Sequence, residues 1–427
     1  MTGMDAPPGD GGRSLRRELG VGDAVVIGLG SMLGAGIYAA MGPAAGAAGS
    51  GLLLGLFVAG LVAYCNAMSS ARLAARYPAS GGTYVYGRER LGGFWGFLAG
   101  WGFVVGKTAS CAAIALTFGI YVWPAHAHGV AVAAVVALTA VNYCGVQKSA
   151  WVTRLIVVCV LIVLGVVVAS VLGSGAGDIA NLSVVQDMSI GGVLQAAGLL
   201  FFAFAGYARI ATLGEEVRDP VHAIPRAIMT ALALTLVVYV AVAVAVLWVL
   251  GPARLASAAA PLVEAVRVAG HVWLIPVVVA GAALAALGSL LALILGVSRT
   301  TLAMARDRHL PVQLAAVHPR FGVPHRAELA VGAVVAVLVA VVDLREAIGF
   351  SSFAVLAYYA IANASAWTLR PEEGRPARII PLIGFVGCVV LAFALPPSSV
   401  LAGASVLAVG AVWFGVRRAV TGRVRRR

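Results

Sequence analysis

The sequence has few charged residues for its length. Of its 427 residues, 11% are Asp, Glu, Lys or Arg and 61% are hydrophobic, whereas ordinary globular domains carry about 25% charged residues. This composition excludes a water-soluble globular protein. The short alternating segments of an outer-membrane barrel are absent as well, and apolar runs recur along the whole chain. We therefore predict an all-α polytopic membrane protein.

Groupings of residues that would bind a metal or carry catalysis are also lacking. The five cysteines lie in or at the ends of apolar runs, without the spacing of metal ligands, so we expect no disulfide, no metal site and no cofactor. No His/Glu metal motif, Ser–His–Asp set or pair of carboxylates is discernible at membrane depth, which argues against an enzyme. No cleavable signal sequence is evident before the first apolar segment.

Apolar windows of about 20 residues, the length that a helix needs to cross a bilayer, occur along the whole chain. We predict twelve transmembrane helices from them. They cover residues 23–45, 50–72, 95–122, 129–147, 151–173, 191–213, 226–250, 269–303, 327–342, 347–369, 379–395 and 399–416.

Basic residues are distributed unevenly between the segments that connect these helices. One alternate set holds most of the arginines, from Arg13 near the start to the basic tail from Arg417 to Arg427, whereas the other set has only Arg254, Arg267 and Arg345 beside several acids. Because cytoplasmic loops carry the excess of Lys and Arg, we expect both termini in the cytoplasm. The net charge of +13 is then a topology signal that suits anionic lipid headgroups, and no nucleic-acid partner is expected.

Glycines interrupt the first apolar segment where a membrane helix should be most regular. Gly28, Gly30, Gly34 and Gly36 crowd its middle. Broken helix at membrane depth survives only where it lines a cavity or binds a ligand, and a Gly-interrupted span is the usual pointer to a transporter binding site. Close packing of helices through glycine is the alternative interpretation. We expect a helix break near residues 33 to 36, with Gly30 and Gly34 contributing to it.

The sixth predicted span has the same peculiarity. Gly206 lies in its middle and Arg209 follows one turn later, so we expect a second break near residues 204 to 208, facing the first across the bundle centre. Since the two spans are five helices apart, they enter the membrane from opposite sides. This is the arrangement of an inverted five-plus-five repeat whose halves each open with a discontinuous helix. It divides the chain into a cytoplasmic segment (1–22), a ten-helix core (23–369), and two accessory helices with a basic tail (370–427).

At these residues the chain resembles the amino acid–polyamine–organocation (APC) transporters, which adopt the LeuT-type fold. The resemblance implies an amino acid permease and a five-plus-five repeat of that type. It is carried by GSMLGAGIY (30–38), YPASGGTYVYGRERLG (77–92), FAFAGYARIATLGEEVRDPVHAIPRAI (202–228) and RTTLAMARDRHLP (299–311).

The resemblance also implies a substrate site built largely from main chain. Free N–H groups where the first helix restarts suit a carboxylate, and free carbonyls suit an ammonium group. The matching N–H positions are Ala35, Gly36 and Ile37, and the matching carbonyl positions are Met32, Phe202 and Ala205. Phe202, Phe204 and Tyr207 would wall the side-chain pocket or cover it as a thin gate, and ordinary helix packing is the alternative for each.

Acidic residues are missing from the middle of every predicted span, so a cationic substrate would find no counter-ion and a neutral amino acid fits better. Some family members carry a glutamate on the sixth helix, where this chain has Ala208 with Arg209 beside it. We expect Arg209 to neutralise Glu215 or Glu216, in a structural or gating role.

Lys107 is the other intramembrane cation. It lies about twelve residues into the third span, roughly 18 Å from its start and near the midplane. A buried lysine can act as a proton-coupling group or as a fixed cation in place of sodium; snorkelling or a bond to a freed carbonyl is the alternative. Some family members have such a lysine on the fifth helix, where this chain has Val160.

Taken together, these features predict a secondary transporter that moves a neutral L-amino acid across the cytoplasmic membrane, coupled to protons. Two alternatives stay open. One is an amino acid or amine exchanger of the same fold. The other is a different twelve-span porter such as a major facilitator, which should show six-plus-six symmetry and a charged motif after its second helix. The sequence indicates neither which amino acid is carried nor an oligomeric state.

Overall fold

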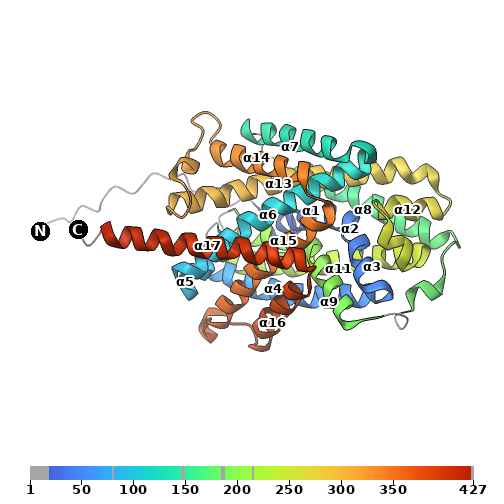
Figure 1. Cartoon of the computed structure of the whole chain (residues 1–427). Coiled ribbons are helices and arrows are strands. Elements are labelled where there is room, and N and C mark those ends of the chain that lie inside the picture. Colours follow the sequence, from blue (N-terminus) through green and yellow to red (C-terminus); the bar gives the residue numbers. More distant parts are fainter. Residues whose placement is uncertain (1–18, 79–80, 146–149, 184–187, 214–215, 425–427) are drawn as a thin grey trace, which may run out of the picture.

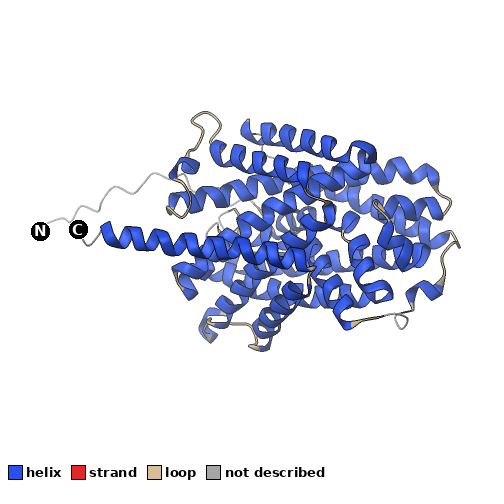
Figure 2. Cartoon of the chain, in the orientation of Figure 1, coloured by secondary structure: helices blue, strands red, loops and turns tan. Residues whose placement is uncertain are grey.

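The computed structural model describes residues 19–78, 81–145, 150–183, 188–213 and 216–424. Within these ranges the chain is helical, and its only β-type pairing is an isolated parallel bridge between Leu19 and Val217 (Figure 2). Most of the predicted N-terminal segment, Glu215, and the last residues of the basic tail lie outside the described residues.

A helix occupies each of the twelve predicted ranges (Figure 1). The α-helices are α1 (Val21–Met32), α2 (Ala35–Ala39), α3 (Met41–Ala48), α4 (Leu52–Arg76), α5 (Thr83–Leu91), α6 (Gly93–Val122), α7 (Ala127–Tyr143), α8 (Ala150–Gly173), α9 (Ile190–Phe204), α10 (Ala208–Ala211), α11 (Pro220–Ser257), α12 (Pro261–Val268), α13 (Ile275–Arg306), α14 (His325–Val341), α15 (Leu344–Trp367), α16 (Ile379–Ala394) and α17 (Pro397–Val424). Short 3₁₀ turns join them: η1 (Gly49–Gly51), η2 (Pro124–His126), η3 (Ile179–Leu182), η4 (Ala205–Tyr207), η5 (Val272–Leu274), η6 (Val312–Ala315) and η7 (Pro371–Glu373).

Ten helical segments among the described residues are long and apolar enough to cross a membrane. The remaining two predicted spans correspond to α14 and α16, which have 17 and 16 residues and are shorter than the usual span of about 20 residues. The first predicted span, 23–45, is not one helix. It contains most of α1, all of α2 and the start of α3, because the chain turns at Ala40 between two short helices.

Local sequence signals account for several helix ends. The Ser189 hydroxyl accepts a hydrogen bond from the Gly192 N–H at 2.9 Å and so caps the start of α9. Pro220 is the first residue of α11. Its missing N–H costs nothing there, because the N–H groups of a first helical turn have no acceptor within the helix. Gly251, with φ of 66°, interrupts α11 near its far end, a backbone conformation that favours glycine.

The helices form an elongated bundle with two distinct ends (Figure 1). The short helix α5 lies at one end and α12 at the other, and we call these the α5 end and the α12 end. Helix α6 packs against α13 and α15 in the middle of the bundle. Helix α17 is mostly exposed, whereas α15 is the most deeply buried of the candidate spans. Apolar side chains that face outward, such as Val237 and Phe393, suit lipid contact.

Two helices lose their regular conformation near the centre of the bundle. Helix α1 ends at Met32, and α2 begins at Ala35 after two non-helical residues. Helix α9 ends at Phe204 and continues through η4 into the single turn α10. We call the two regions the α1–α2 break and the α9–α10 break.

Glycine allows the two breaks to touch through their backbones. A Cβ on Gly206 would lie 2.4 Å from the carbonyl oxygen of Ser31, and a Cβ on Gly36 would lie 2.6 Å from Cα of Ala203. Both distances are too short for any side chain. The two broken segments therefore pack closer than residues with side chains would allow.

Substitution of Gly206 tests this contact. We expect Gly206→Ala to lower the free energy of unfolding by about 1–3 kcal/mol, because the methyl group must push the Ser31 backbone away. Gly165→Ala in α8 is the matched control, since its Cβ would meet nothing within 4 Å. Thermal unfolding of the purified proteins measures both. Equal melting temperatures for the two variants would contradict the proposed close approach.

Candidate functional site

A cavity of about 540 Å³ lies between the two breaks and helices α6 and α13. Its walls combine main chain of the breaks with charged and hydroxyl side chains. The residues at its inner end include Gly34, Ala35, Gly36, Lys107, Ser110, Phe202, Gly206 and Ser289.

The cavity extends from the breaks toward the α5 end. Gly81 just before α5, Glu216 after α10 and Arg306 at the end of α13 line its outer part. No described residue of α3 or α12, toward the α12 end, lines it. On that side the Tyr121 hydroxyl donates to the Tyr38 carbonyl at 2.9 Å, and the two rings meet edge to face at 5.6 Å. The cavity therefore reaches only one end of the bundle.

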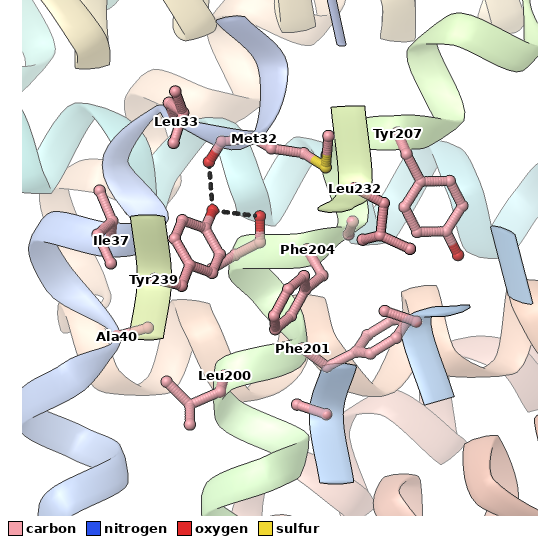
Figure 3. Close-up of a cluster of buried hydrophobic side chains, with 14 of the residues drawn as sticks. Met32, Leu33, Ile37, Ala40, Leu200, Phe201, Phe204, Tyr207, Leu232 and Tyr239 are labelled. Atoms are coloured by element: carbon pink, nitrogen blue, oxygen red, sulfur yellow. Dashed lines mark hydrogen bonds between the residues drawn. The ribbon is translucent and has the colours of Figure 1, made fainter. Parts of the chain in front are cut away.

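Tyr239 of α11 joins the two breaks. Its hydroxyl lies 2.5 Å from the Met32 carbonyl oxygen and 2.9 Å from the Ala203 carbonyl oxygen, so one side chain contacts acceptors of both broken helices (Figure 3). Tyr239 is fully buried. A carbonyl without a partner at this depth would cost free energy, so this hydroxyl stabilises both irregular segments.

Lys107 of α6 contacts the α9–α10 break directly. Its ammonium donates to the Ala205 carbonyl oxygen at 3.1 Å, and the Tyr359 hydroxyl donates to the same oxygen at 3.4 Å. Lys107 is buried and also lines the cavity. A hydrogen bond to a freed carbonyl is one alternative that the sequence suggests for Lys107, and the structure contains this bond.

A smaller cavity of about 190 Å³ adjoins the first. It lies between α1, α8 and α13, and both cavities share Arg209, Glu216 and Arg299. Near it, the Ser289 hydroxyl of α13 donates to the Gly30 carbonyl at 2.9 Å. Each break therefore has carbonyls that are bonded by side chains of other helices.

The predicted site residues fall into two groups. Met32, Gly34, Ala35, Gly36, Lys107, Phe202, Gly206 and Arg209 line the larger cavity. Ile37, Phe204, Ala205 and Tyr207 are buried outside its lining, and Gly30 lies within α1 and lines the smaller cavity. The Phe204 ring packs on Tyr239 at 5.0 Å and the Tyr207 ring on Tyr359 at 5.1 Å, as in ordinary helix packing.

Arg209 makes a local contact. Its guanidinium donates to the Thr212 hydroxyl at 3.2 Å. Glu216 lies near enough for its charge to act on Arg209, but no salt bridge joins the two among the residues that the structure describes. The other predicted partner, Glu215, is outside the described residues.

Two of the sequence motifs meet at the α5 end. Tyr84 of α5 donates to the Asp307 carboxylate, and the Arg88 guanidinium donates to the same carboxylate at 3.0 Å. Burial, reinforced by Asp307, raises the pKa of the Tyr84 phenol, so the phenol stays protonated as a donor. The Thr83 N–H donates to the Tyr358 hydroxyl at 3.1 Å. These contacts tie α5 to α13 and α15 beside the outer part of the cavity.

Glu328 is a buried acid that sequence reasoning passed over. It lies in the first turn of α14, it is fully buried, and neither carboxylate oxygen has a hydrogen-bond partner among the described residues. Arg299 is close enough to act on it electrostatically. It lies at the edge of the predicted span 327–342, where the sequence analysis did not consider it, and the packing around α14 buries it.

Comparison with known proteins fits this geometry. The profile of the amino acid permease family matches residues 19–416. The chain belongs to the amino acid permease family. An uncharacterised transporter of Mycobacterium tuberculosis is 75% identical over 411 residues, which cover 96% of this chain and 93% of the relative.

More distant relatives carry substrate names. The branched-chain amino acid permease BcaP of Bacillus subtilis is 28% identical, covering 85% of this chain and 83% of its own. Human cationic amino acid transporter 4 is also 28% identical, covering 85% of this chain and 61% of its own. Membership of this family, together with the many apolar helices, indicates that the permease is a multi-pass membrane transporter.

Removal of one hydroxyl tests the bridge between the breaks. We expect Tyr239→Phe to destabilise the permease by about 1–3 kcal/mol, because the buried Met32 and Ala203 carbonyls lose the single hydroxyl donor that they share. Tyr64→Phe is the matched control: Tyr64 lies on α4, is 41% exposed and makes no hydrogen bond within the described residues. Thermal unfolding in detergent compares the two. A Tyr239→Phe protein as stable as the control would show that the bridge contributes nothing.

Proposed function

We propose that the permease moves a neutral L-α-amino acid across the cytoplasmic membrane by alternating access, coupled to protons. The observation that carries the proposal is the pair of broken helices packed together over one cavity. Transporter binding sites are usually formed by the free backbone groups of discontinuous helices at membrane depth. The close contact of Gly36 with Ala203 and of Gly206 with Ser31 supports a single site formed by both breaks.

The substrate carboxylate, in this proposal, binds the N–H groups of Ala35, Gly36 and Ile37 where α2 begins. Ala35 and Gly36 line the cavity, which supports the assignment. The substrate ammonium binds the carbonyls of Met32, Phe202 and Ala205. Ala205 lies just outside the cavity lining, and both lone pairs of its carbonyl oxygen already accept, from Lys107 and Tyr359. The substrate ammonium therefore binds there only after it displaces one of these two donors.

Arrangement in the membrane is part of the same proposal. We infer twelve transmembrane helices, a LeuT-type five-plus-five repeat over residues 23–369, and cytoplasmic termini. The excess of arginine in one set of loops supports the orientation. In that orientation the α5 end faces the cytoplasm, and the packed Tyr38 and Tyr121 seal the other side. The cavity then belongs to an inward-facing state.

A substrate panel tests the substrate class. In proteoliposomes, we expect uptake of at least one radiolabelled neutral L-amino acid, because the cavity lining offers main-chain groups for both ends of an α-amino acid. We expect little uptake of arginine or polyamines. Transport restricted to sugars, nucleobases or inorganic ions would overturn the proposal, and preference for arginine would overturn its neutral part.

Lys107 is proposed as the coupling group. Its ammonium bonds to the α9–α10 break and lies at the cavity wall, so loss of its proton would weaken its hold on the Ala205 carbonyl. Protonation is thereby linked to the conformation of the broken segment. While it is protonated, the Lys107 ammonium also repels sodium.

Substitution of Lys107 tests coupling. Uptake driven by an imposed pH gradient should be abolished in Lys107→Met, while substrate binding survives at least in part. The control is counterflow exchange in the same vesicles, which needs no gradient. Sodium-dependent uptake by the wild type, or unchanged pH-driven uptake in Lys107→Met, would contradict proton coupling and favour an exchanger.

A further inference from the structure

Positive charge dominates the walls of the larger cavity. Among its lining residues in the described part of the chain, the ionisable side chains are Lys107, Arg209, Arg299, Arg306 and Glu216. Four cations therefore face a single carboxylate, with a net charge of +3 when all five are ionised. They are spread from the breaks to the α5 end, so the positive field extends along the whole cavity.

The cations are not neutralised by salt bridges among the described residues. Lys107 bonds to a carbonyl and Arg209 to a hydroxyl, both of which leave the charge uncompensated. Glu216 acts electrostatically on Arg209. Glu328 acts on Arg299 from behind, but it does not line either cavity. A substrate in the cavity therefore meets excess positive charge.

We infer that this set of cations is a charge filter: the cavity admits neutral and anionic substrates and excludes cationic ones. The electrostatic free energy of a solute in a field scales with its net charge, so a zwitterion of zero net charge is little affected whereas a cation is repelled. Walls of low dielectric concentrate such a field inside a cleft. The inference rests on the proposed function and deepens it by naming the residues that set the charge class.

Lys107 is the specificity-determining member. Its ammonium lies 3.1 Å from the Ala205 carbonyl oxygen, at the inner end where both breaks line the cavity, and it is buried from solvent screening. The α-ammonium of any amino acid is offset by its own carboxylate, whereas a cationic side chain adds a second positive charge near Lys107 that nothing in the substrate offsets. Arg299 and Arg306 act earlier along the path and oppose its entry.

The field can be measured without any substrate. A thiol introduced by Ala292→Cys, on the wall shared by both cavities, is labelled with an anionic and a cationic methanethiosulfonate reagent. The exposed Cys144 and the partly exposed Cys159 are first replaced by alanine, and the other three cysteines are buried. The ratio of the two rates, normalised to a free thiol in solution, cancels changes in the thiolate fraction.

The expected ratio favours the anionic reagent by about tenfold or more, since cleft potentials reach several kT. Lys107→Met and Arg299→Gln should each lower the ratio severalfold, while Lys107→Arg keeps it. Arg345→Gln is the matched control: it also removes one positive charge, but Arg345 binds the Ala256 carbonyl at the α12 end. A ratio near one, or an equal effect of Arg345→Gln, would overturn the charge filter.

A second measurement extends the test to selectivity. Thermal shifts of the purified permease are compared for norleucine and lysine, which differ mainly in the terminal ammonium. In the wild type and in Lys107→Arg, the concentration that gives a half-maximal thermal shift should be at least tenfold higher for lysine than for norleucine. Lys107→Met should reduce this gap between the two ligands. A gap that is unchanged in Lys107→Met would overturn the role of Lys107. Failure of every neutral amino acid to bind would overturn the proposed function instead, and the reagent ratio would still test the filter.

Discussion

Where a helix breaks inside an apolar bundle, its backbone carbonyls lose their intrahelical hydrogen bonds and need other donors. The rest of the site depends on which groups supply those donors. At both breaks, side chains of other helices supply the donors. The Tyr239 hydroxyl bonds to Met32 and Ala203, and the Lys107 ammonium bonds to Ala205. Because an unsatisfied carbonyl costs free energy in a medium without water, these bonds allow irregular backbone to persist at this depth. They also connect the breaks to α11 and α6.

The same contacts limit what the breaks can do. Gly36 and Gly206 bring the two backbones together so closely that no side chain fits between them. A movement of one broken segment must therefore involve the other. Tyr239 reinforces this link, since it holds an acceptor from each segment. The inner wall of the cavity behaves as one unit made from two distant parts of the sequence.

Charge adds a second constraint to the cavity. Three arginines and a lysine line it. Among the described residues, the acids that act on them are Glu216, which shares the lining, and Glu328, which lies outside it. Buried cations usually acquire close counter-ions because desolvation is expensive. Here carbonyl and hydroxyl groups bond to Lys107 and Arg209 instead. The positive charges therefore remain available to act on a solute.

Much of the fold could be predicted from the sequence. Apolar run lengths located a helix in all twelve predicted ranges, and the glycine clusters indicated where α1 and α9 lose helical conformation. Both signals are local: hydrophobic length and backbone freedom are properties of neighbouring residues. The family motifs likewise identified an amino acid permease. Helix ends were less predictable, because the turn at Ala40 and the extension of α11 to Ser257 depend on packing rather than on composition.

The tertiary structure alone decided which groups meet. Nothing in the sequence distinguishes Tyr239 from a lipid-facing aromatic residue, yet it joins both breaks. Phe204 and Tyr207, which the motif suggested for the substrate pocket, instead pack on tyrosines outside the cavity lining. Glu328 looked like a residue at a helix end and is fully buried. Sequence determined where the helices and their breaks lie and which charges they carry, because those follow from adjacent residues. The partners of each freed carbonyl and buried charge were decided by the fold, because hydrogen bonds and electrostatic contacts depend on distances between residues far apart in the chain.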